Sequence, residues 1–106
     1  MNQYINFEPE NIDGFEVSKK RKKIWNTELD LLFKLDEVCK KYNLKYWLDG
    51  GSLLGAIRHK GFIPWDDDVD LVMFRDDYDK LVEVSKVDFS EPYYFQIIFF
   101  LLLYHL

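Results

Sequence analysis

Apolar side chains recur at steps of three and four residues through the first half of the chain. The positions that define this pattern are Trp25, Leu29, Leu32, Leu35, Cys39 and Tyr42. Because such spacing places apolar groups on one face of a helix, we predict a long amphipathic helix from Ser18 to Tyr42, with Asn43 as its stop. A second helix is predicted from Asp76 to Val87, where the acidic start favours the helix dipole.

A strand, a turn, a short helix and a second strand are predicted between these two helices. The apolar run Tyr46-Trp47-Leu48 is typical of a buried strand, and Asp49-Gly50-Gly51-Ser52 breaks it. A helix should begin at this turn with Ser52 as its N-cap and with one face, formed by Leu53, Leu54 and Ile57, packed on a sheet. A hydrophobic strand from Val69 to Phe74 completes the unit. The predicted fold class is α+β, with a small mixed sheet.

The turn Gly50-Gly51-Ser52 is a candidate phosphate-binding site. Glycine lets the backbone approach a ligand closely, and the free N–H groups and positive dipole end of a helix start suit an anion. The same tripeptide is also an ordinary tight turn into a helix, and this alternative stays open.

A carboxylate cluster leads into the second strand and consists of Asp66, Asp67, Asp68 and Asp70. Strand alternation would send Asp68 and Asp70 to one face, where the two carboxylates repel each other. A divalent cation removes that cost, and oxygen ligands without Cys or His favour Mg²⁺ or Mn²⁺ over zinc. We therefore predict Asp68 and Asp70 as metal ligands. The alternative is a solvated acidic turn.

The sequence contains two basic runs, one inside this unit and one at the start of the long helix. Arg58, His59 and Lys60 lie between the turn and the carboxylates, where they could hold phosphate oxygens or a sugar-phosphate acceptor. An ordinary basic helix C-terminus followed by Gly61 is the alternative. The earlier run from Lys19 to Lys23 is interpreted as a solvated first helical turn, with contact to anionic lipid or an acidic glycan as the alternative.

Length, charge and cysteine content narrow the function. A chain of 106 residues with 48% hydrophobic residues predicts one small domain with an adequate core. The net charge of −5 argues against broad nucleic-acid binding, so no nucleic-acid partner is expected. Cys39 is the single cysteine and is predicted to be a buried thiol in a reducing compartment. The first 14 residues lack the apolar segment of a signal peptide, so a cytoplasmic location is expected.

The stretch from Leu48 to Asp70 closely resembles the LicD family, which includes bacterial phosphocholine transferases and relatives of fukutin and fukutin-related protein. The residues that carry the resemblance are Leu48-Asp49-Gly50-Gly51-Ser52-Leu53-Leu54-Gly55-Ala56, Arg58-His59-Lys60-Gly61-Phe62-Ile63-Pro64-Trp65, Asp66-Asp67-Asp68-Val69-Asp70 and Arg75-Asp76-Asp77-Tyr78. The family is similar to the wider nucleotidyltransferase fold, in which a Gly-Ser turn opens a helix and an Asp-x-Asp pair binds metal. The resemblance therefore implies a partial nucleotidyltransferase-like fold here.

The resemblance also implies a reaction: metal-dependent transfer of a phospho-substituent, such as phosphocholine from a CDP-linked donor, onto a sugar hydroxyl of a cell-surface glycan or teichoic-acid precursor. Asp66, Asp68 and Asp70 are the expected catalytic residues. Asp68 and Asp70 would hold Mg²⁺ or Mn²⁺, and Asp66 would orient or deprotonate the attacking hydroxyl. The donor phosphate would lie at Gly50, Gly51 and Ser52, supported by Arg58 and Lys60. Two alternatives remain: a nucleotidyltransferase that uses CTP or ATP, and a non-catalytic remnant.

The C-terminal sequence departs from the family. The segment 93–106, YYFQIIFFLLLYHL, is almost wholly apolar and is shorter than the roughly 20 residues that a membrane-crossing helix needs. We interpret residues 96–106 as an aberrant tail left by a truncation or frameshift. Peripheral association with the inner face of the membrane is the alternative. The expected organisation is an N-terminal extension over 1–17, the N-terminal catalytic half of a LicD-like domain over 18–95, and this tail.

Overall fold

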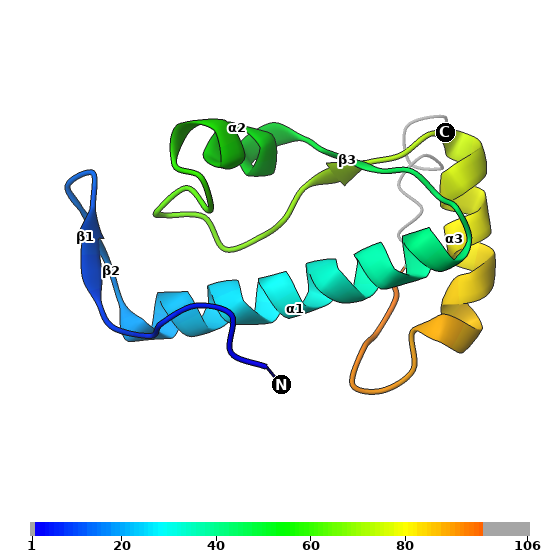
Figure 1. Ribbon diagram of the computed structural model, residues 1–106, viewed down its shortest axis with the longest axis horizontal. Helices are drawn as coiled ribbons and strands as arrows, with labels where there is room; N and C mark the ends of the chain where they lie inside the picture. Colours follow the sequence, from blue (N-terminus) through cyan, green and yellow to red (C-terminus); the bar gives the residue numbers. More distant parts are fainter. Residues whose placement is uncertain (1, 97–106) are drawn as a thin grey trace, which may run out of the picture.

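A computed structural model of the chain describes residues 2–96, so the expectations for 97–106 lie outside the described residues. The order of elements is β1 (Glu10–Ile12), β2 (Phe15–Val17), α1 (Lys19–Lys41), β3 (Trp47–Leu48), α2 (Gly50–Arg58), β4 (Leu71–Val72) and α3 (Arg75–Asp88). The long helix α1 forms the base of the molecule (Figure 1). The β1–β2 hairpin stands at its N-terminal end, α3 lies across its C-terminal end, and α2 with β3 lies along one side. The predicted α+β class is confirmed.

The helix α1 has the predicted boundaries, because its ends are capped as the sequence indicates. The Ser18 hydroxyl accepts a hydrogen bond from the Arg21 N–H at 3.1 Å, which is the standard N-cap arrangement. At the other end Asn43 adopts a positive φ of 56°, which ends the helix, and the Leu44 N–H bonds back to the Cys39 carbonyl at 2.7 Å. The predicted burial of Cys39 is also confirmed.

The sheets are smaller than predicted, and the prediction of a mixed sheet is wrong for the described residues. Both strand pairs are antiparallel: β1 with β2, and β3 with β4, where Trp47 faces Val72 and Leu48 faces Leu71. The predicted burial of the first strand is also wrong, because the side chain of Trp47 is exposed and contacts the exposed ring of Phe74.

The N-terminal extension contains an element that the sequence analysis missed. Asp13 and Gly14 both have positive φ, 51° and 85°, as a tight two-residue hairpin turn requires. The Asp-Gly pair is itself a known hairpin signal, so the sequence did contain the information. The hairpin packs on the basic start of α1, where Lys22 is only 3% exposed and its Nζ lies 2.5 Å from Glu10 Oε1. Lys22 is therefore buried and paired, which corrects the expectation of a fully solvated basic turn.

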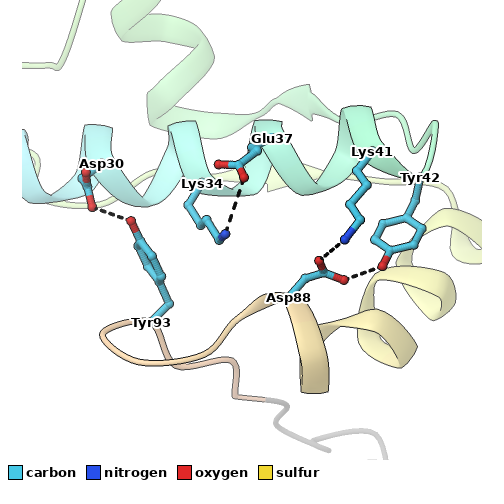
Figure 2. A network of polar contacts seen from close by, with 7 residues as sticks. All are labelled: Asp30, Lys34, Glu37, Lys41, Tyr42, Asp88 and Tyr93. Atoms are coloured by element: carbon cyan, nitrogen blue, oxygen red, sulfur yellow. Dashed lines mark hydrogen bonds and ion pairs between the residues drawn. The ribbon is translucent and has the colours of Figure 1, made fainter.

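The main hydrophobic core lies where α3 crosses the end of α1. It is formed by Val38, Leu81 and Val84, and the side chains packed against it are Leu35, Tyr42, Leu44, Met73, Phe89 and Phe95. The segment that follows α3 returns along α1 (Figure 2). Tyr93 donates its hydroxyl to Asp30 at 3.0 Å, while Lys41 and Tyr42 both donate to Asp88. Among residues 2–96, no helix is long and apolar enough to cross a bilayer.

Candidate functional site

The turn between β3 and α2 lies against the segment that leads into β4. The Asp49 N–H donates to the Asp70 carbonyl at 2.9 Å, which extends the pairing of the two strands into the turn. Asp49 is the N-cap of α2, so the prediction of Ser52 in that position is wrong. The helix begins three residues earlier than expected because Gly50, with a φ of 50°, makes the bend. Ser52 instead accepts a hydrogen bond on Oγ from the Asp70 N–H at 2.7 Å.

The two glycines bring the helix start close to the carboxylates. A Cβ on Gly51 would lie 2.6 Å from Asp66 Oδ2, and one on Gly50 would lie 3.3 Å from Asp70 Oδ2. As the first positions of α2, these glycines carry N–H groups that no carbonyl of the helix accepts. The Ser52 hydroxyl still has its own proton to donate. The turn thus presents hydrogen-bond donors beside two carboxylates.

Asp68 and Asp70 were predicted to lie on the second strand, but they lie on the segment just before it. The strand β4 contains only Leu71 and Val72. Their mutual repulsion is nevertheless present: the charge of Asp70, followed by burial and the charges of Asp66 and Asp67, raises the pKa of Asp68. Within residues 2–96, the side chains of Asp68 and Asp70 form no ion pair. The core packing does not explain why Asp68 and Asp70 lie so close together without an ion-pair partner among the described residues.

The chemistry of the cluster suits a hard divalent cation that is only partly coordinated by protein. In the described part of the chain, no three acidic, His or Cys side chains surround a common point as a complete metal cage would require. Mg²⁺ characteristically takes one or two carboxylates and completes its shell with waters and substrate phosphates. Asp68 and Asp70 fit that pattern and would be the protein ligands.

The three basic residues at the end of α2, Arg58, His59 and Lys60, differ in what they contact. Arg58 is exposed in the last turn of α2, about 12 Å along the helix from Gly50 at 1.5 Å per residue, so the structure does not bring it to the turn. Lys60 lines a cavity that Ser52 and Asp68 also line. His59 Nδ1 lies 3.0 Å from Asp13 Oδ2 and connects the end of α2 to the hairpin.

Two residues of α1 that were not predicted to belong to the site contact its acidic loop, and the charges of the loop influence a third. The Trp25 indole N–H donates to the Asp66 carbonyl at 2.7 Å. Arg21 donates to the Trp65 carbonyl at 3.2 Å and lies 3.6 Å from Asp67. Burial and the charges of Asp68 and Asp67 raise the pKa of Glu28. Trp25 entered the sequence pattern only as an apolar position, and nothing in the local sequence of Arg21 or Glu28 signals an interaction with a loop about 40 residues away.

The segment that carries this turn and these carboxylates defines the class of protein. Residues 43–97 match the family described as LicD/FKTN/FKRP, nucleotidyltransferase domain. Because the match covers more than half of the chain, the chain belongs to the LicD family.

Several curated proteins resemble this chain over part of its length. It is 49% identical over 65 residues to the lipopolysaccharide cholinephosphotransferase LicD of Haemophilus influenzae, covering 61% of this chain and 24% of that protein. An uncharacterised protein of Rickettsia prowazekii is 36% identical over 75 residues, which is 71% of this chain and 27% of that one. Human ribitol 5-phosphate transferase FKRP is 55% identical over 40 residues, or 38% of this chain and 8% of FKRP. The chain thus spans about a quarter or less of these relatives. No significant match to a solved structure was found.

Proposed function

We propose that this chain carries the donor-binding half of a LicD-type phosphotransferase, which moves a phospho-substituent such as phosphocholine from a CDP-linked donor to a sugar hydroxyl. The observation that carries the proposal is the contact between the turn and the acidic segment: Gly51 abuts Asp66, and Ser52 binds the backbone of Asp70. Family membership supports it, as do the names of two relatives, which are transferases of phosphocholine and ribitol 5-phosphate.

Each residue of the site has a role that follows from its position. The amides of Gly50 and Gly51 and the hydroxyl of Ser52 would donate to the donor phosphates at the positive end of α2. Lys60 would add a cation from the neighbouring cavity wall, whereas Arg58 lies too far along α2 for direct contact with the turn. Asp66, adjacent to Gly51, would orient the attacking hydroxyl.

A divalent cation held by Asp68 and Asp70, Mg²⁺ or Mn²⁺, would supply neutralisation of the negative charge on the donor phosphates. The residues of the chain need supply little covalent chemistry, because positioning provides much of the catalysis in phosphoryl transfer. The acceptor would be a surface glycan or teichoic-acid precursor, and a location at the inner face of the membrane would suit that acceptor.

Calorimetry of CDP-choline binding with and without Mg²⁺ tests the proposal on the full chain. We expect binding that requires Mg²⁺ and that the double variant Asp68→Asn, Asp70→Asn abolishes. The matched control is Asp76→Asn, Glu83→Gln, which removes the same charge from exposed positions on α3. Equal binding by the wild type and the site variant would refute the assignment of the two carboxylates.

Melting temperatures distinguish the loss of carboxylate repulsion in a variant from misfolding of that variant. Because Asp70 and its neighbours disfavour the charge on Asp68, Asp68→Asn should raise the melting temperature in metal-free buffer. Added Mg²⁺ should stabilise the wild type but not this variant. Transfer of nucleotide rather than phosphocholine from a labelled donor would instead favour the nucleotidyltransferase alternative.

A further inference from the structure

A cavity of about 410 Å³ begins at the candidate site and extends away from it toward the N-terminal segment. Its polar end is lined by Gly51, Ser52, Asp66 and Asp68, which are residues of the site itself. Most of the remaining lining is apolar and comes from α1, the loop after α2 and the N-terminal segment. The volume falls in the range of about 300–1,000 Å³ that is typical of small-molecule sites. The cavity is therefore continuous with the proposed phosphate site and is large enough for the rest of a donor.

One wall of the cavity is a fixed aromatic surface. The rings of Trp25 and Phe62 are stacked, with centroids 5.1 Å apart and planes 8° from parallel, and both residues line the cavity. Trp25 is buried and its indole N–H is held by the Asp66 carbonyl, so the stack is anchored to the acidic loop. Phe62 is half-buried and leaves part of its ring accessible. A flat ligand group could extend this stack directly beside the carboxylates.

The N-terminal segment contributes Ile5 and Ile12 to the lining, and two pairs of polar side chains hold it in place. Lys22, on α1, pairs with Glu10 of β1 and donates to Asn6 at 3.1 Å. At the hairpin tip Asp13 pairs with His59, which follows α2. This segment lies outside residues 43–97, the part of the chain that matches the family. Part of the cavity is thus built by residues that the family match does not include.

We propose that this cavity binds the nucleoside of the nucleotide-linked donor, with Phe62 as the stacking surface and Ile12 as a wall. The inference rests on the function proposed above, because it takes the phosphates to lie at Gly51 and Ser52. A nucleobase is the planar group that such a stack accommodates, and polar side chains at the rim, Asn6 and Lys60 among them, suit its edges and its sugar. A flexible alkyl chain would need neither the aromatic plane nor those polar groups.

Calorimetry with CDP and with inorganic pyrophosphate, both in Mg²⁺, tests this inference on the full chain. If the nucleoside enters the cavity, CDP should bind at least about tenfold more tightly than pyrophosphate, since stacking of one base on an aromatic side chain contributes about that much. Phe62→Leu should remove most of this tenfold preference and leave pyrophosphate affinity unchanged. Phe74→Leu is the matched control, because Phe74 is exposed and does not line the cavity.

A second pair of variants covers the case in which Phe62→Leu does not fold. Ile12→Trp should fill part of the cavity from the hairpin and lower CDP affinity about tenfold, whereas Ile57→Trp, on the exposed face of α2, should not. Equal affinities for CDP and pyrophosphate in the wild type would overturn the nucleoside site but leave the phosphate site intact. Absence of Mg²⁺-dependent binding for both probes would overturn the proposed function and this inference together.

Discussion

The two ends of α1 support regions of opposite character. At its C-terminal end, α1 and α3 enclose the hydrophobic core, and the acidic side chain of Asp88 is satisfied by Lys41 and Tyr42 (Figure 2). Along its N-terminal half, α2 exposes Leu53, Leu54 and Ile57, the last at 72%, which corrects the prediction that this face packs on a sheet. Among the described residues, Asp68 and Asp70 form no ion pair, whereas their neighbour Asp67 pairs with Arg21.

The contrast separates residues that hold the fold from residues available to a ligand. In the α1–α3 region the charge of Asp88 is neutralised by Lys41, so it offers little to a substrate. The α2–β4 region keeps its carboxylates close together and its helix-start amides open, an arrangement that costs stability and favours binding of a cation and phosphate. We expect variants in the two regions to differ in the same way: loss of stability in one, loss of binding in the other.

The largest expected effect is in the core. Leu81→Ala should lower the free energy of unfolding by about 2–5 kcal/mol, because Leu81 is 4% exposed and its truncation leaves a cavity. Leu54→Ala, at a side chain 39% exposed on α2, should cost about 1 kcal/mol or less. Urea unfolding followed by circular dichroism measures both. Similar losses for the two variants would show that the exposed face of α2 is covered in solution and would break the comparison.

A smaller effect is expected where α2 meets the loop that follows it. A Cβ on Gly55 would clash with the carbonyl oxygen of Gly61 and would lie 3.0 Å from the backbone nitrogen of Ile63. Gly55→Ala should therefore lower the free energy of unfolding by about 1–3 kcal/mol. Because the displaced loop leads to Asp66, Mg²⁺-dependent CDP-choline binding should weaken as well. Gly61→Ala is the control, since the nearest atom to its Cβ is 4.0 Å away. Equal melting temperatures for the two variants would disprove the close packing at Gly55.

The smallest effect concerns pH. Hydrogen bonds from Lys41 and Tyr42 hold the pKa of Asp88 below its ordinary value of 3.8. The stabilisation from Asp88 is therefore complete above pH 3.8 and is lost as the pH falls through the lower pKa of the folded state. Asp88→Asn should lower the melting temperature slightly at neutral pH, and the difference from the wild type should vanish in acid. Glu8→Gln, at an exposed position, is the control; a difference that persisted in acid would mean that packing, not charge, is responsible.

The sequence predicted the helices well and the sheets poorly, for a physical reason. Apolar spacing and end signals such as Ser18 and Asn43 act within a few residues, so the bounds of α1 and α3 follow from local pattern. Strand pairing depends on contacts between distant segments. The apolar pattern after Asp70 therefore predicted a strand to Phe74, whereas the antiparallel pairing extends only over Leu71 and Val72.

The site was predictable in composition but not in assembly. The glycines, Ser52 and the carboxylates were identified from one local stretch, and the structure brings Gly50, Gly51 and Ser52 beside Asp66 and Asp70. The contacts from Trp25 and Arg21 and the effect of the loop charges on Glu28 were not predicted, because they depend on how α1 packs against the loop. The distance of Arg58 from the turn likewise follows from the full length of α2, whose N-cap is Asp49 and not Ser52.

Asp30, in the middle of α1, accepts hydrogen bonds from two tyrosines near opposite ends of the described chain, Tyr4 at 2.9 Å and Tyr93 at 3.0 Å. This single carboxylate therefore connects the two ends of the described chain through hydrogen bonds. Fraying at either end removes a partner that helps to orient Asp30 for the other, so the two ends should open together. Amide hydrogen exchange would then report one shared opening event for the segments around Tyr4 and Tyr93, although almost the whole sequence separates them.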